Sequence, residues 1–92
     1  MEDIQKLRKK IDELDEQILR FLGERVEVCR SIGLLKRSQG MSIADPSREF
    51  EVYEKIKSKA ADFGLDADQA EAVYRQIINM CSIVQETQEK QE

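Results

Sequence analysis

The sequence that decides the fold is IQKLRKKIDELDEQILRFLGERVEVCRSIGLL, residues 4–35. With Ile4 at position a of a heptad, nine of the ten a and d positions carry apolar side chains, and no proline interrupts them. An apolar pattern sustained over this length predicts one long helix. We call the nine residues the seam: Ile4, Leu7, Ile11, Leu14, Ile18, Phe21, Val28, Ile32 and Leu35.

The length of this helix determines the expected assembly. A helix of about 35 residues is about 50 Å long, at 1.5 Å per residue. The rest of the 92-residue chain is too short to cover the whole seam. Much of the seam should therefore pack against a second copy of the chain, so we expect a homodimer.

Two further helices are predicted downstream of a short loop that begins near residues 39–42. Asp45 is the expected N-cap of the second helix, with Pro46 at its first helical position. Gly64 should end that helix. Asp66 should cap the third.

Apolar side chains mark the inner faces of these two helices. The second helix is predicted to bury Phe50, Tyr53, Ile56 and Ala60. The third is predicted to bury Ala70, Val73, Ile77, Cys81 and Val84. Because no repeat or low-complexity segment appears, we expect an all-α chain of three helices in a single domain over residues 1–92.

Composition argues against several classes of function. The net charge is -4, from 15 basic and 19 acidic residues, which disfavours binding to nucleic acid or to an anionic membrane. No apolar run is long enough for a membrane span, and the acidic N-terminus does not resemble a signal peptide. We therefore expect a cytoplasmic protein. Cys29 and Cys81 match no metal or redox spacing and are interpreted as small core residues.

Arg25 occupies a seam position that should be apolar. An unpaired charge there is costly, so Arg25 either sets the register, extends to solvent or binds a ligand. Lys36 lies eleven residues later, three turns on with an offset of about 20°. The two cations therefore project in nearly the same direction and could converge on an anion. Lys36 could equally be a solvated cation that the helix C-terminus favours.

Arg8 lies about 25 Å from Arg25 along a straight helix. It cannot reach the same small site from the same chain. In an antiparallel dimer the partner's Arg8 could arrive there. The alternative interpretation is an exposed surface arginine among neighbouring lysines.

Two later positions have a structural and a functional interpretation. Arg48 and Glu49 lie in the first turn of the second helix, where backbone N–H groups are unpaired. They could bind a ligand, or they could be polar residues of the kind that commonly occupy a first helical turn, where the helix dipole favours Glu. Gln85 lies at the margin of the third helix's apolar face, so its amide could donate into a pocket or could point outward. The chain has no histidine, which excludes Ser-His and Cys-His catalysis.

Taken in order, these residues resemble the all-helical chorismate mutase family along nearly the whole chain. The similar motifs are Leu7-Arg8-Lys9-Lys10-Ile11-Asp12, Glu24-Arg25, Lys36, Asp45-Pro46-Ser47-Arg48-Glu49 and Gln85. The resemblance implies an intertwined homodimer whose long first helices pair antiparallel, with two equivalent sites.

The resemblance also implies roles. Arg25 and the partner's Arg8 would hold substrate carboxylates, and Lys36 would contact a carboxylate and the ether oxygen. Glu49 would accept from the substrate hydroxyl, and Gln85 would donate to the ether oxygen. Asp45 and Arg48 would shape the hydroxyl end. Cys81 would line the substrate pocket where relatives often carry a small hydroxyl residue, which weakens one polar contact.

This chemistry fits the residues available. The rearrangement of chorismate to prephenate is unimolecular, so it needs no nucleophile, base, metal or cofactor. It needs a substrate held in a near-attack geometry and donors placed where charge grows on the ether oxygen. Because Gln85 is a neutral amide that donates without being protonated, we expect activity that needs no acidic pH.

Other functions remain open. An isochorismate-pyruvate lyase shares this fold and a similar cationic pocket, although residues 45–49 look more like the mutases. A non-enzymatic homodimeric helical interaction module explains the heptads but not Arg25. A third alternative is a regulatory or accessory helical domain of a larger protein. Because the family pattern fills the 92 residues, we expect no attached regulatory domain and no inhibition by phenylalanine or tyrosine.

Overall fold

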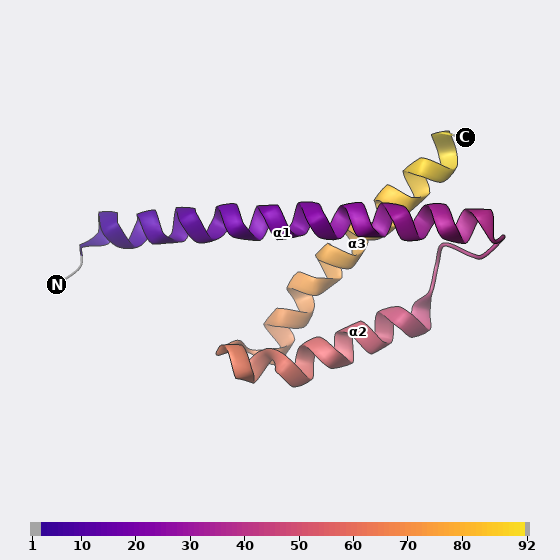
Figure 1. The fold of residues 1–92 in the computed structure, drawn as a ribbon. Helices are drawn as coiled ribbons and strands as arrows, with labels where there is room; N and C mark the ends of the chain where they lie inside the picture. The colour runs from indigo at the N-terminus through magenta and orange to yellow at the C-terminus, as the bar shows by residue number, and fades with distance from the viewer. Residues whose placement is uncertain (1–2, 92) are drawn as a thin grey trace.

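The computed structural model describes residues 3–91, and the side chains as far as residue 87. Within that range the chain forms α1 (Ile4–Ser38), α2 (Pro46–Lys59), the short 3-10 helix η1 (Ala60–Phe63) and α3 (Ala67–Gln91), with no strand. The prediction of an all-α chain with a long N-terminal helix is confirmed (Figure 1). No helix in this range is long and apolar enough to cross a membrane.

The helices begin and end at residues that satisfy exposed backbone groups. The Asp45 carboxylate accepts a hydrogen bond from the Arg48 backbone N–H at 3.2 Å, with Pro46 in the first turn as predicted. The Asp66 carboxylate accepts from the Gln69 N–H at 2.9 Å. Gly64 adopts φ 71°, so the predicted stop is confirmed, although it ends η1 rather than α2. These caps fix where the loops around the site begin.

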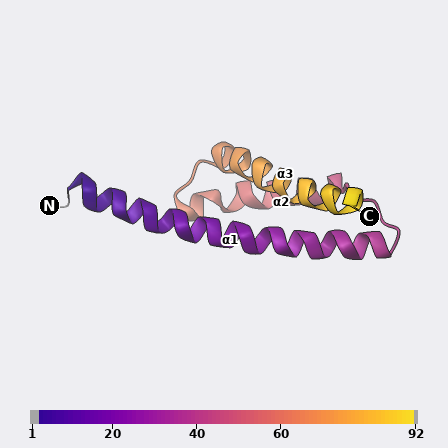
Figure 2. The same cartoon turned by 90° about the horizontal axis from the view of Figure 1, so that it is seen from above.

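Helix α3 packs against both of the other helices. It crosses the C-terminal half of α1 and packs along α2, as the two views show (Figures 1 and 2). Between α2 and α3, the Lys57 ammonium lies 3.5 Å from the Glu71 carboxylate, and the Arg75 guanidinium lies 4.4 Å from the centre of the Tyr53 ring. In the described part of the chain α1 and α2 have no direct packing, which leaves room for a pocket between them.

The core of the single chain is small. In α1 only Cys29 and Gly33 are buried, and Leu22 and Val26 lie on the same side and are half-buried. We call these four residues the α3-facing stripe. At 100° per residue the stripe lies about 100° around the helix from the seam. Helix α1 therefore uses a different face for α3 than the one its heptad pattern emphasises.

Two predicted core residues are exposed. The prediction that Phe50 and Val73 are buried is wrong, because they are 64% and 59% exposed. Val52 is half-buried on α2, and Ile78 is buried on α3. The physical reason on α3 is that this helix contacts both α1 and α2, so its buried residues do not follow a single stripe. On α2 the inward residue of this turn is Val52, and two residues apart on a helix differ in direction by about 160°, so Phe50 lies on the outer side.

The seam is exposed along its whole length, each of its nine side chains being 43–64% accessible. Residues 3–21 include no buried or half-buried residue, and this part of α1 extends past the other helices (Figures 1 and 2). The radius of gyration is 16.6 Å, against about 12 Å for a compact domain of this size. The chain exposes 7421 Å², against about 5,500 Å² for a compact monomer of its mass.

Candidate active site

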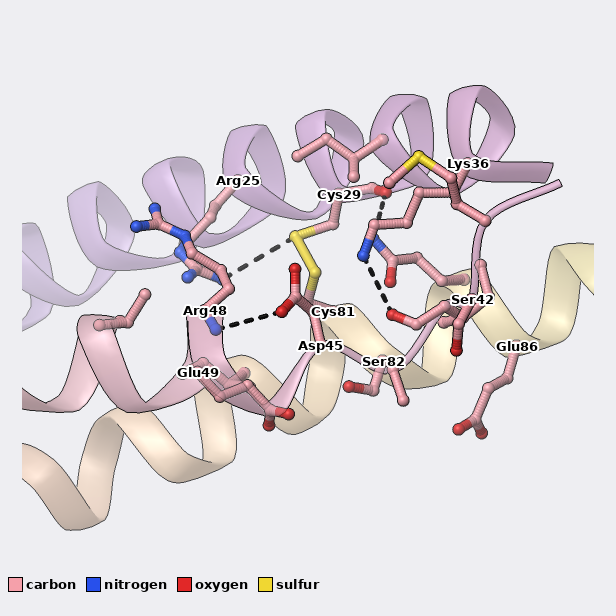
Figure 3. Close-up of a pocket in the computed structure, with 17 residues that line it drawn as sticks. Arg25, Cys29, Lys36, Ser42, Asp45, Arg48, Glu49, Cys81, Ser82 and Glu86 are labelled. Carbon is pink, nitrogen blue, oxygen red and sulfur yellow. Dashed lines mark hydrogen bonds between the residues drawn. A yellow bond between two sulfur atoms is a disulfide. The ribbon is translucent and has the colours of Figure 1, made fainter. Parts of the chain in front are cut away.

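A pocket of about 500 Å³ lies between the C-terminal half of α1, the loop before α2, the first turn of α2 and the C-terminal half of α3 (Figure 3). It gathers side chains that are up to sixty residues apart in the sequence. Seven of the eight predicted site residues line it: Arg25, Lys36, Asp45, Arg48, Glu49, Cys81 and Gln85. The structure therefore brings together the residues that the sequence pattern selected, apart from Arg8.

Helix α1 contributes Arg25 and Lys36 to one wall. Both are half-buried and face the pocket, as their helical spacing predicts (Figure 3). The Lys36 ammonium donates to the carbonyl oxygen of Ile43 at 3.1 Å. This bond holds the loop against α1 and aims the ammonium into the pocket. An ammonium has three N–H donors, so Lys36 can also bind an anion. The interpretation of Lys36 as a freely solvated cation is wrong.

The loop and the start of α2 contribute a second wall. The Asp45 carboxylate accepts from the Ser47 hydroxyl and the Arg48 backbone N–H, each at 3.2 Å. The Asp45 carboxylate therefore acts as the N-cap of α2. The Glu49 side chain is half-buried in the pocket. The Arg48 guanidinium lies 3.4 Å from Glu51, and its side chain is 63% exposed, so it is a cation at the solvent-exposed rim of the pocket.

Gln85 is the most buried polar side chain that the structure describes, at 5% exposure. Its amide nitrogen donates to the Cys29 carbonyl at 2.8 Å, which ties α3 to α1. The interpretation of Gln85 as an outward residue is therefore wrong. A primary amide carries two N–H groups, so one donor satisfies the backbone and the other is available to the pocket.

Cys29 and Cys81 are joined by a disulfide that links α1 to α3. Their Cα atoms are 5.4 Å apart, within the range that a disulfide spans. The interpretation of both as small core residues is confirmed for Cys29, which is 5% exposed, whereas Cys81 is only half-buried, and the pairing itself was not predicted. Sequence spacing could not reveal the pair, because two cysteines 52 positions apart are brought together only where α3 crosses α1.

Arg8 does not join the pocket of its own chain. It is exposed in the N-terminal half of α1, about 25 Å along the helix from Arg25. Any contribution from Arg8 must therefore come from a second copy of the chain.

Sequence reasoning missed Ser82 and Glu86, which also line the pocket. Both lie one residue after a predicted site residue on α3, and both are four residues from another lining position. Residues three and four apart share a helix face, so this signal was available once Cys81 and Gln85 were selected. No group of three or more potential metal-ligating side chains exists among the described residues.

The pocket contains equal numbers of positively and negatively charged side chains. Arg25, Lys36 and Arg48 supply three cations, and Asp45, Glu49 and Glu86 supply three carboxylates. Arginine binds carboxylates through paired hydrogen bonds. The cations can therefore bind carboxylate groups of a small molecule, and the carboxylates can accept hydrogen bonds from its donors.

Comparisons with known proteins point in the same direction. The family model of chorismate mutase type II matches residues 7–86. The chain is 40% identical over 84 residues to the bifunctional chorismate mutase/prephenate dehydratase of Aquifex aeolicus, covering 88% of this chain and 23% of that protein. It is 33% identical over 66 residues to the chorismate mutase of Methanocaldococcus jannaschii, covering 72% of this chain and 67% of that protein. It is also 31% identical to the T-protein of Haemophilus influenzae over 85% of this chain and 21% of that protein. The chain thus spans about a quarter of two of these relatives and two thirds of the third.

Proposed function

Because the chain belongs to the chorismate mutase type II family, we propose that it rearranges chorismate to prephenate, a step toward phenylalanine and tyrosine. It would do so as an intramolecular transferase, within one domain over residues 1–92 and in the cytoplasm. The observation that carries the proposal is the convergence of Arg25, Lys36 and Gln85 on one pocket. The family assignment favours this reaction over the lyase and the interaction module.

Substrate binding would rest on two arginines. Arg25 would bind one carboxylate of chorismate from within the chain, and the partner's Arg8 would bind the other. Two such clamps hold the enolpyruvyl arm over the ring and lower the entropic part of the barrier. Glu49 would accept from the substrate hydroxyl, with Asp45 and Arg48 shaping that end of the pocket. Cys81 would line the floor.

Rate acceleration would come from donors at the ether oxygen. Negative charge grows there as the C–O bond breaks, so Lys36 and Gln85 would bind the transition state more tightly than the substrate. The fixed bonds of both residues support this role. Lys36 is held by the Ile43 carbonyl and Gln85 by the Cys29 carbonyl, so little reorganisation is needed when the charge develops.

The active form would be an intertwined homodimer whose α1 helices pair antiparallel through the seam. The chain exposes about 1,900 Å² more than a compact monomer of its mass. An obligate homodimer commonly buries a comparable area per protomer. An antiparallel pairing carries the N-terminal half of each α1, and with it Arg8, toward the partner's pocket. Each dimer would then contain two equivalent sites.

The first experiment is to mix purified protein with chorismate, follow the loss of its ultraviolet absorbance and identify the product, with Arg25→Ala alongside. Conversion to prephenate that the variant loses would support the proposal. Without conversion, the protein is given isochorismate and assayed for pyruvate. Pyruvate release would replace the mutase with the lyase, and no reaction with either substrate would favour the interaction module.

A further inference from the structure

The disulfide lies inside the proposed substrate pocket rather than in a structural position remote from it. Both Cys29 and Cys81 line the pocket, with Arg25 on one side of the sulfur atoms and Lys36 on the other (Figure 3). Gln85 donates to the backbone carbonyl of the same Cys29. Reduction or formation of this disulfide would therefore alter the pocket among the side chains that would hold the substrate.

The two cysteines have different surroundings. Cys29 is 5% exposed, and its sulfur lies 3.9 Å from a guanidinium nitrogen of Arg25. Cys81 is half-buried and opens onto the pocket. A neighbouring cation favours the thiolate, which is both the attacking and the leaving form of a cysteine. Cys81 is thus the sulfur that a small reagent can reach, and Cys29 is the sulfur that Arg25 stabilises.

We propose that Cys29 and Cys81 form a reversible thiol–disulfide pair whose oxidation weakens substrate binding. The inference rests on the proposed function, because its ligand is chorismate. A chain whose relatives act in biosynthesis would be expected in a reducing compartment, where disulfides are commonly transient or redox-sensing.

The exchange balances with a low-molecular-weight disulfide as oxidant. The Cys81 thiolate attacks one sulfur of that disulfide, and the first small thiol leaves. The Cys29 thiolate then attacks the sulfur of Cys81, which forms the intramolecular disulfide and releases the second small thiol. Two protein thiols are oxidised and one small disulfide is reduced to two thiols. A small dithiol reverses both steps, attacking at Cys81 and releasing Cys29 beside Arg25.

Oxidation changes what the pocket offers to a ligand. A reduced Cys81 presents an S–H group, which is a weak donor, toward a substrate that carries oxygen acceptors. The disulfide has no S–H. Because that contact would form in the bound substrate and persist in the transition state, its loss should raise KM several-fold and leave kcat nearly unchanged.

The test compares the wild-type protein after treatment with oxidised glutathione and after treatment with dithiothreitol. Alkylation and intact mass should give no free thiol and no glutathione adduct in the first sample and two free thiols in the second. Steady-state assays with chorismate should then give a several-fold higher KM for the oxidised protein. Equal kinetic constants in the two states, or a bond that neither forms nor breaks under these conditions, would overturn the proposal.

Two variants separate the lost donor from a change in folding. Cys81→Ser keeps a donor and Cys81→Ala removes it, and neither can form the disulfide. Both should be insensitive to glutathione and dithiothreitol, with a several-fold lower KM for the serine variant than for the alanine variant. Equal KM values would show that the donor does not matter, which contradicts the proposal.

The experiment also distinguishes failure of the mutase assignment from failure of the redox inference. No turnover in either state would overturn the mutase assignment and leave chorismate intact in the sample. The redox inference is then decided by the ratio of oxidised glutathione to the square of reduced glutathione at which half of the pair is oxidised. Ligand binding and oxidation must affect each other equally, so added chorismate should raise that ratio by the factor by which it prefers the reduced form. An unchanged ratio would overturn the inference.

Discussion

The two halves of α1 carry the same heptad pattern but have different surroundings. From residue 3 to residue 21 every side chain is exposed, whereas the C-terminal half buries Cys29 and Gly33 against α3 and lines the pocket. The seam runs through both halves and stays exposed in both. The apolar pattern that predicts the helix therefore does not mark a face that this chain buries within itself. The pocket is built on another face.

This difference explains the placement of the cationic residues. Arg25 lies between the seam and the α3-facing stripe, where it can face both the pocket and a second α1. Arg8 lies in the half of α1 whose side chains are all exposed. In our account, the C-terminal half of α1 builds the site and the N-terminal half completes the partner's site.

The largest effect is expected from a charge in the seam. Leu14→Glu would place a carboxylate in an apolar interface from both chains, which costs several kcal/mol for each buried ion. We expect monomers by analytical ultracentrifugation and no measurable turnover of chorismate.

Leu34→Glu is the matched control for that change. Leu34 is 48% exposed and Leu14 is 51% exposed, but Leu34 lies roughly 140° around the helix from the seam. This variant should remain dimeric and active. A dimeric, active Leu14→Glu variant would contradict the claim that the seam, and not the face that carries Leu34, forms the dimer interface.

The next largest effect is expected in the pocket half of α1. Lys36→Ala removes a donor that would act mainly in the transition state, so kcat should fall on the order of 10²–10³-fold. Steady-state kinetics with chorismate measure it, and circular dichroism should show an intact helical fold. A rise in KM with unchanged kcat would mean that Lys36 only binds the ground state.

The effect of pH on the rate tests Gln85. The wild-type rate should be nearly constant from about pH 5.5 to 8, because the primary amide of Gln85 does not titrate. Gln85→Glu should require a proton, so its rate should fall about tenfold per pH unit above the pKa of the new carboxyl. A wild-type rate that rises steeply toward acid, following one carboxyl titration, would contradict the role of Gln85.

The smallest effect is expected away from α1, in the contact between α2 and α3. A hydrogen bond from Arg75 lowers the pKa of Glu71 below its ordinary value of 4.5. A lowered pKa means that the contact contributes stability above pH 4.5 and loses it as the pH falls through the folded-state pKa. Glu71→Gln should therefore unfold at slightly lower temperature at pH 7, and the difference should shrink in acid. A difference that grows in acid would contradict this sign.

Much of the fold could be predicted because its signals are local. The long helix, the Asp45-Pro46 cap and the Gly64 stop each follow from one continuous segment of sequence, and each is confirmed. The packing of the seam against a second copy stays a prediction. Phe50 on α2 and Val73 on α3 were misplaced because their burial depends on how α3 packs against the other two helices. That geometry is not local.

The site divides in the same way. Arg25 and Lys36 could be paired from helix geometry alone, and the resemblance supplied the positions on α2 and α3. The disulfide and the bond from Gln85 to the Cys29 carbonyl depend on where α3 crosses α1. No spacing along the chain encodes that crossing.

The most direct test of a site shared between two chains is the activity of a mixed dimer. Arg8→Ala and Arg25→Ala chains are coexpressed with different affinity tags, and the heterodimer is purified through both tags. One of its two sites then has both arginines and the other has neither, so the heterodimer should recover about half of the wild-type activity although each parent homodimer is nearly inactive. A heterodimer as inactive as its parents would contradict the claim that Arg8 acts in the partner's site.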